Sequence, residues 1–210
     1  MPRCPGLVLY WRVRVTERGL FHETVAEQAL TAITTRFDGK PAYGISGPEG
    51  VTVLDPITFN TLGTLKDGKV VTSYAPATGP FSWPLWGGKA WTAAYQYTGL
   101  SYGRTWLAAW ADTKVAAFEP ITVPAGTFQA VRIECAGGIG THTTGGRHGD
   151  SSTSGIQSDD ICWYAPAVQL IVRSVVNRSG THFRGAGQTV TELVTPPYLS
   201  PAPSRSRPRA

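Results

Sequence analysis

Charged residues, methionine and cysteine are all scarce in this sequence. Charged side chains make up 16% of the 210 residues, with one methionine and three cysteines. Glycine (24) and proline (16) are abundant instead. That balance is typical of many strands joined by tight turns, whereas a helical bundle would carry more Glu and Lys. The length suits one β domain with a single core, and we expect residues 1–195 to form it.

The short motifs that identify common enzyme classes are also absent. The sequence contains no HExxH, Walker loop, dinucleotide-binding glycine pattern or paired CxxC. "GISG" at 44–47 lacks the second half of a nucleophile elbow. The sequence therefore gives no support for catalysis and indicates no cofactor.

No apolar run reaches the roughly 18 residues that a membrane-spanning helix needs, so no transmembrane segment is predicted. The N-terminus "MPRCPGLVLYWRVRV" lacks the cationic region and cleavage site of a signal peptide, and it enters an apparent strand at once. We therefore expect an export signal or the true start to lie upstream. Although no signal peptide is visible, we also expect an extracytoplasmic location in the periplasm, the envelope or the medium.

The formal net charge of +5 is located mainly at one end of the chain. Arg205, Arg207 and Arg209 lie in the tail "PPYLSPAPSRSRPRA", and residues 1–195 carry only +2. No basic face is predicted on the folded part, and no specific nucleic-acid partner. Because residues 196–210 are rich in Pro and Ser and have no apolar pattern, we expect a disordered basic tail.

The three cysteines, Cys4, Cys135 and Cys162, have no metal-ligand spacing. Cys135 ends the run "VRIEC" and Cys162 begins "CWYAP", so the two could lie opposite each other if these runs are neighbouring strands. A disulfide and a pair of buried free thiols fit this arrangement equally well.

Apolar and polar residues alternate with period 2 in several segments, the pattern of half-buried antiparallel strands. The clearest are "LVLYWRVRV" (7–15), "WTAAYQYT" (91–98) and "AVRIEC" (130–135). In the second, one face would carry Trp91, Ala93, Tyr95 and Tyr97. We predict an all-β fold of about eight to ten antiparallel strands in a strongly curved sheet or half-open barrel of long hairpins, with room for one short helix.

The turn residues support hairpins. "FDGK" (37–40) and "KDGK" (66–69) place Asp-Gly between strand-like runs, as two-residue hairpin loops require. "VPAGTF" (123–128) suits a three-residue loop with Gly126 in the left-handed position. Residues 21–37 and 104–118 fit either a helix or a strand, and the β-branched residues and the following Asp-Gly favour a strand for the first.

Residues 137–159 are rich in Gly, Ser and Thr and predict a long polar loop. His142, His148 and Asp150, with Asp159 and Asp160, are candidate metal ligands, because imidazole and carboxylate suit zinc and similar ions. Their spacing matches no metal motif, so a solvated polar loop is the simpler interpretation. A hydrolase or metal-dependent enzyme that uses residues 137–160 remains an alternative.

Five of the seven tryptophans lie between residues 83 and 110, three of them in "FSWPLWGGKAW" (81–91). Exposed, they would stack on sugar rings and make a carbohydrate- or polymer-binding module. Buried, they would fill the core of a curved sheet. Pro84 between Trp83 and Trp86 marks a strand entry at the rim.

Three stretches in order, "FSWPLWGGKAW" (81–91), "FEPITVPAGTFQAVRIE" (118–134) and "CWYAPAVQLIVRS" (162–174), resemble a group of bacterial exported or envelope β-domains of unknown function. That group carries PLxGKxW, VPAGTF and WYAPxV elements. Gln169 and Gly88 depart from its usual residues. The resemblance implies a curved sheet distantly like the half-barrels of lipoprotein carriers.

We predict a non-catalytic envelope or secreted domain whose concave aromatic face is either simply core or accepts an apolar small molecule or lipid. The candidate ligand-binding residues are Trp91, Tyr95, Tyr97, Val131, Ile133 and Trp163. The sequence makes no prediction of the oligomeric state.

Overall fold

The protein is described by a computed structural model of residues 7–19, 21–99, 105–144, 151–180 and 186–201. These residues form strands, turns and loops, with no helix among them. The prediction of an all-β antiparallel fold is confirmed. The described residues also include no helix long and apolar enough to cross a membrane.

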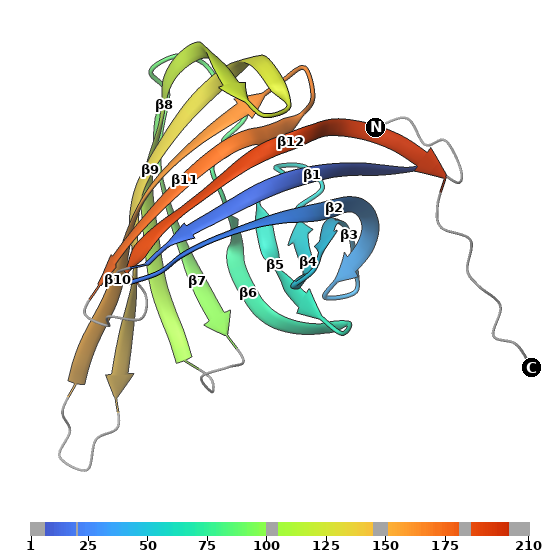
Figure 1. Cartoon of the computed structure of the whole chain (residues 1–210). Helices are drawn as coiled ribbons and strands as arrows, with labels where there is room; N and C mark the ends of the chain where they lie inside the picture. The colour runs from blue at the N-terminus through green and yellow to red at the C-terminus, as the bar shows by residue number, and fades with distance from the viewer. Residues whose placement is uncertain (1–6, 20, 100–104, 145–150, 181–185, 202–210) are drawn as a thin grey trace, which may run out of the picture.

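Twelve strands follow one another along the chain (Figure 1). They are β1 (Leu7–Arg18), β2 (Glu23–Phe37), β3 (Lys40–Gly47), β4 (Gly50–Leu54), β5 (Thr61–Lys66), β6 (Lys69–Thr78), β7 (Ala90–Gly99), β8 (Thr105–Val123), β9 (Gly126–Thr144), β10 (Ser151–Ala165), β11 (Leu170–Gly180) and β12 (Gly187–Pro201).

Each strand pairs with its neighbours in sequence, and β1 pairs antiparallel with β12, which closes the sheet into a barrel. Figure 1 shows these two strands side by side. Their pairing runs from Leu7 opposite Pro201 to Arg18 opposite Gln188, with register shifts near Arg12. Closure leaves no free sheet edge to attract other strands. The fold is thus a closed barrel with more strands than expected.

Two hairpins turn as predicted. Asp38 and Gly39 have φ of 48° and 75°, and Asp67 and Gly68 have φ of 52° and 74°. Positive φ at both central positions matches the twist of a two-residue hairpin, and Asp-Gly adopts it with little strain. The β8–β9 hairpin differs from the prediction: Val123 already pairs with Gly126, so its loop has two residues instead of three.

The segments that fitted either a helix or a strand are strands β2 and β8. Strand β8 is 19 residues long and pairs with β7 and β9, so its backbone hydrogen bonds are made between strands. In β7 the predicted face is the less exposed one: Trp91, Ala93, Tyr95 and Tyr97 are half-buried, while the residues between them are exposed.

The predicted loop at 137–159 is mostly paired strand. Residues Gly137–Thr144 of β9 lie opposite Ser151–Ser158 of β10, and only 145–150 fall outside the described residues. This hairpin extends beyond its neighbours in Figure 1. These strands have too few apolar residues to show the alternating pattern of a half-buried strand. They pair nevertheless, because the hydrogen bonds between strands are made by backbone groups, which Gly, Ser and Thr residues also have. Strand β12 likewise continues to Pro201, into the predicted tail, and 202–210 lie outside the described residues.

Three clusters of buried side chains form the core. The first centres on Trp11, Val172 and Leu193, and the third joins Phe37, Ala42 and Val53. The second, which concerns the site below, consists of Phe81, Val115, Val131, Ile133 and Cys162. Ile133 is 0% exposed and lies opposite Val115 and Cys162 on the adjacent strands. Because residues two apart on a strand share a face, this cluster marks which side chains point into the barrel.

Candidate functional site

The tryptophan-rich segment 79–91 is anchored inside the barrel at three points. Phe81 belongs to the second cluster, and Leu85 and Trp91 pack against it. Asn60 holds the segment from the other side: its amide donates to the Phe81 carbonyl at 2.9 Å and its oxygen accepts from the Phe81 N–H at 3.1 Å. Both backbone groups of Phe81 are therefore satisfied although the residue is buried.

Lys89 organises the turn that follows. Its ammonium donates to the carbonyls of Ser82 and Pro84, and it lies 4.3 Å from the ring centroid of Trp86. The N–H of Gly88, which has φ of 80°, donates to the Val115 carbonyl at 3.0 Å. The left-handed backbone at this glycine lets the segment turn onto β8 and enter β7.

Trp83 and Trp86 of this segment face outward, with 41% and 53% of their surface exposed. Trp83 stacks on Phe81 with ring centroids 5.2 Å apart, and its indole N–H donates to the Thr58 carbonyl at 3.0 Å. The three tryptophans of "FSWPLWGGKAW" are thus divided between the interior (Trp91) and the surface.

Three tyrosines meet farther along β6 and β7. Tyr74 lies opposite Tyr97, with ring centroids 5.4 Å apart, and 5.8 Å from the ring of Tyr95. Burial raises the pKa of Tyr74, and the neighbouring Tyr97 and Tyr95 add to the effect, while Arg178 of β11 opposes it. This aromatic group lies on the same face of β7 as Trp91.

A cavity of about 240 Å³ lies beside this group, next to the second cluster. Side chains on four successive strands line it: Ala111 and Thr113 (β8), Cys135 (β9), Asp160 (β10) and Val176 (β11), together with Tyr95 of the adjacent β7. Thr113 pairs with Cys135, Cys135 with Asp160, and Asp160 with Val176. These four residues form one continuous row across the barrel wall, with Ala111 two residues along β8 from Thr113.

Asp160 is the ionisable group of this row. Its Oδ1 is buried and has no hydrogen-bond partner among the described residues. Burial raises the pKa of the Asp160 carboxyl, and this outweighs the opposing effects of Arg178 and of the Ser158 hydroxyl. A carboxyl in this setting favours a neighbour that can donate a hydrogen bond or a positive charge.

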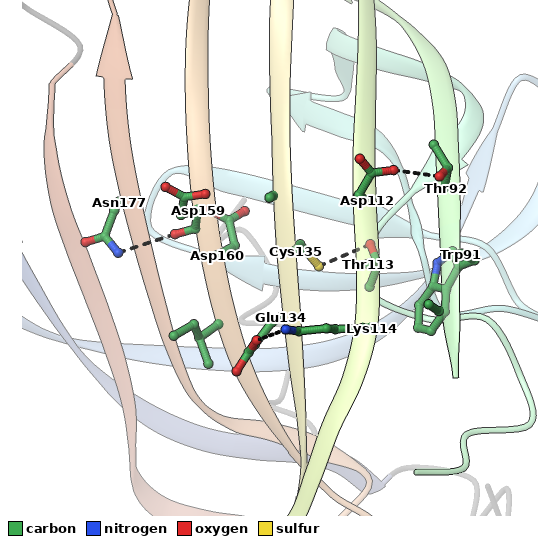
Figure 2. Close-up of a pocket in the computed structure, with 13 residues that line it drawn as sticks. Trp91, Thr92, Asp112, Thr113, Lys114, Glu134, Cys135, Asp159, Asp160 and Asn177 are labelled. Atoms are coloured by element: carbon green, nitrogen blue, oxygen red, sulfur yellow. Dashed lines mark hydrogen bonds and ion pairs between the residues drawn. The ribbon is translucent and has the colours of Figure 1, made fainter. Parts of the chain in front are cut away.

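A second, wider depression of about 680 Å³ crosses the same strands. Figure 2 shows the polar side chains around it. Thr92 donates to Asp112 at 2.6 Å, and Lys114 pairs with Glu134 at 2.9 Å. Asp112 and Glu134 therefore already have partners, whereas Asp160 lines this depression as well as the cavity, so its unpaired Oδ1 borders both.

The cysteines lie on neighbouring strands, as predicted, but not opposite each other. Cys135 pairs with Asp160, and Cys162 pairs with Ile133, an offset of two residues. Both are free thiols. Burial raises the pKa of each thiol, most strongly at Cys162, so both stay protonated at neutral pH and are poor nucleophiles.

The structure places the predicted apolar residues in three parts of the barrel. Val131 and Ile133 are 3% and 0% exposed and fill the second cluster with Trp91 against them. Tyr95 lines the cavity instead, and Tyr97 joins the tyrosine group beside it. Trp163 packs against the first cluster, and its indole N–H donates to Glu119 at 2.8 Å.

The candidate metal ligands are scattered. His142 lies within β9, while His148 and Asp150 fall outside the described residues. Asp159 and Asp160 are consecutive in β10 and therefore point to opposite faces. Within the described ranges, no three His, Cys, Asp or Glu side chains come close enough to hold a metal ion.

Sequence reasoning missed Tyr74 and Arg178, and it named Asp160 only as a candidate metal ligand in a polar loop. The alternation in "SDDICW", with Asp160 two residues before the buried Cys162, was the available signal for Asp160. Tyr74 had no such signal, because its position depends on the β6–β7 pairing.

No protein-family model and no curated protein matches the chain. Three solved structures are similar to it. A putative lipoprotein from Parabacteroides distasonis has 13% identity and a TM-score of 0.49 over 95% of this chain and 97% of that one. The hypothetical lipoprotein YmcC from Escherichia coli has 11% identity and a TM-score of 0.45 over 95% and 86%. A putative exported protein with a YmcC-like fold from Bacteroides fragilis has 14% identity and a TM-score of 0.43 over 95% and 98%. At these identities the likeness concerns the fold alone.

Proposed function

We propose that the protein is a non-catalytic β-barrel that binds a small, mostly apolar molecule in its interior, in the cavity between Tyr95 and Asp160. The observation that carries this proposal is the row of inward side chains on β8–β11, which leaves about 240 Å³ beside a fully packed cluster. Ligand sites in proteins are commonly concave, with a mostly apolar lining and a few polar groups.

The size of the cavity limits the ligand. Liquid water occupies about 30 Å³ per molecule, so 240 Å³ corresponds to about eight waters. Pockets for drug-sized ligands begin at about 300 Å³. The proposal is therefore a small molecule with a short apolar body, in preference to a lipid with long acyl chains. Part of the proposal is an extracytoplasmic location, which the motif resemblance implies and which cell fractionation tests.

Native and denaturing mass spectra of the freshly purified protein test the proposal. Ala111→Phe and Ser174→Leu place extra atoms in the cavity from two different strands, and Ala94→Phe adds the same ring on the exposed face of β7. We expect a non-covalent mass on the wild type and on Ala94→Phe that is absent from both cavity variants. The same mass on all four proteins, or on none, would contradict the proposal.

A second candidate function is carbohydrate binding at Trp83 and Trp86, which are exposed on one short segment. Trp83 contacts Phe81 and Tyr164, and the Lys89 ammonium lies over Trp86, so Trp86 is the more exposed ring for stacking on a sugar. Trp86→Ala should then abolish co-sedimentation with insoluble polysaccharide. Unchanged co-sedimentation, or none by the wild type, counts against it.

A further inference from the structure

The cavity carries a polar atom that no described residue satisfies. Oδ1 of Asp160 is buried and lacks a hydrogen-bond partner in the described part of the chain. A buried acceptor without a partner has lost its hydrogen bonds to water and gained none in return, so buried polar atoms in native proteins nearly always have a partner. This atom is on the row that lines the cavity.

The neighbouring groups do not meet this need. Arg178 lies opposite Ser158, two residues along from Asp160; burial raises the pKa of the Asp160 carboxyl, while the charge of Arg178 and a hydrogen bond from the Ser158 hydroxyl both lower it. Neither gives Oδ1 a hydrogen bond. Ala111 and Val176 in the cavity lining are apolar, and the lining also carries the hydroxyls of Thr78, Thr113, Ser158 and Ser174, none of which gives Oδ1 a hydrogen bond. A bound molecule would therefore meet one carboxyl acceptor among apolar and hydroxyl side chains.

We infer that the cavity selects a small molecule with a short apolar body and one hydrogen-bond donor, a hydroxyl or an ammonium group, that donates to Oδ1 of Asp160. This inference rests on the proposed function and specifies its ligand class. An anionic group is disfavoured, because a carboxylate would face the Asp160 carboxylate across the cavity.

Three six-carbon probes and benzene distinguish the possibilities. 1-Hexanol offers a neutral donor, hexylamine a cationic donor, hexanoate an anion, and benzene no donor. Dissociation constants come from protein-observed NMR titrations at neutral pH. We expect saturable binding of 1-hexanol and hexylamine, and binding of benzene and hexanoate at least tenfold weaker.

Variants separate the acceptor from the cavity. Asp160→Leu removes the acceptor and should weaken 1-hexanol and hexylamine at least tenfold without weakening benzene. Asp160→Asn keeps an acceptor oxygen without the charge, so 1-hexanol should be retained within a few-fold while hexylamine weakens. Asp159→Asn, on the outward face of the same strand, is the matched control and should leave all four constants unchanged.

The two proposals fail in different ways. If all four probes bind equally and Asp160→Leu changes none of them, the donor inference is overturned while interior binding stands. If hexanoate binds best, it is overturned in favour of anion recognition by Arg178. If no probe binds the wild type, or if Ala111→Phe and Ser174→Leu leave binding unchanged, the interior site itself is refuted.

Discussion

The barrel interior has two adjoining regions with opposite properties. In the second cluster, Val115, Ile133 and Cys162 on three adjacent strands are 1%, 0% and 7% exposed and fill the space between the walls. Two residues along the same strands, Thr113, Cys135 and Asp160 form the next inward row and border the cavity. A shift of two residues along these strands therefore leads from a closely packed apolar cluster to a cavity bordered by polar side chains.

The second cluster and the cavity contribute to different properties of the protein, the first to stability and the second to the proposed binding. Close-packed side chains contribute stability through buried area and dispersion contacts. The row at Asp160 contributes less, since its small residues leave space and Oδ1 of its carboxyl lacks a hydrogen-bond partner among the described residues. Sites that bind ligands commonly carry such local cost. We therefore expect substitutions in the two regions to affect different measurements.

The largest expected effect is in the packed region. Ile133→Ala removes a fully buried side chain and leaves a void that its neighbours on β8 and β10 cannot fill. We expect a loss of about 3 kcal/mol in the free energy of unfolding, measured by urea denaturation. Val25→Ala, at a position 59% exposed, should cost less than about 0.5 kcal/mol. Equal losses would mean that the second cluster is not packed as described.

The next effect concerns the anchor of the 79–91 segment. Asn60→Ala leaves the N–H and carbonyl of buried Phe81 without partners, so we expect a loss of about 2 kcal/mol. Asn177→Ala is the control, because Asn177 bonds to Gln188 and Asp159 nearer the surface. Chemical denaturation measures the free energy of unfolding of both variants. A loss at Asn60→Ala no larger than at Asn177→Ala would contradict the role of Asn60 in holding Phe81.

A smaller effect is expected at Lys89. Lys89→Met keeps much of the side-chain volume but removes the hydrogen bonds to Ser82 and Pro84 and the contact with Trp86. We expect a loss of about 1 kcal/mol in the free energy of unfolding. The tryptophan emission should also change, because the ammonium over Trp86 is removed. The matched variant Lys114→Met breaks a surface pair with Glu134 and should be nearly neutral. An unchanged emission spectrum in Lys89→Met would argue against the described turn.

The smallest effect is a pH dependence at the cavity. The pKa of Asp160 is raised above its ordinary value of 3.8, so the folded protein holds this proton more tightly than the unfolded chain does. That contribution to stability is present below pH 3.8 and is lost as the pH rises through the folded-state pKa. Relative to wild type, Asp160→Asn should therefore gain stability as the pH rises from 3 to 7. Denaturation across this range tests the sign, and a difference in unfolding free energy (Asp160→Asn minus wild type) that falls as the pH rises would contradict it.

Much of the fold could be predicted from local signals. Alternation identified β1, β7 and β9, and Asp-Gly identified two hairpins, because side-chain direction and turn geometry are properties of neighbouring residues. Closure could not be predicted, since it depends on pairing between chain ends that lie far apart in sequence. The short β3–β4 hairpin at 47–50 carries no Asp-Gly, which helps explain the low strand count.

The site was harder to predict than the fold. Alternation placed Trp91 with Tyr95, and Val131 with Ile133, on common faces, and burial agrees. Alternation could not predict which part of that face is packed core and which part borders the cavity, because this depends on contacts with residues distant in sequence. Asp160 was assigned to a loop because polar residues surround it, although its strand pairs with β9.

The most direct test of the division between packed core and binding cavity is the 1-hexanol titration followed amide by amide. The account predicts saturable shifts at Tyr95, Ala111, Thr113, Asp160 and Val176, with the Val131 and Ile133 signals unmoved. Shifts centred on Val131 and Ile133, shifts confined to Trp83 and Trp86, or no saturable shift at all would contradict it.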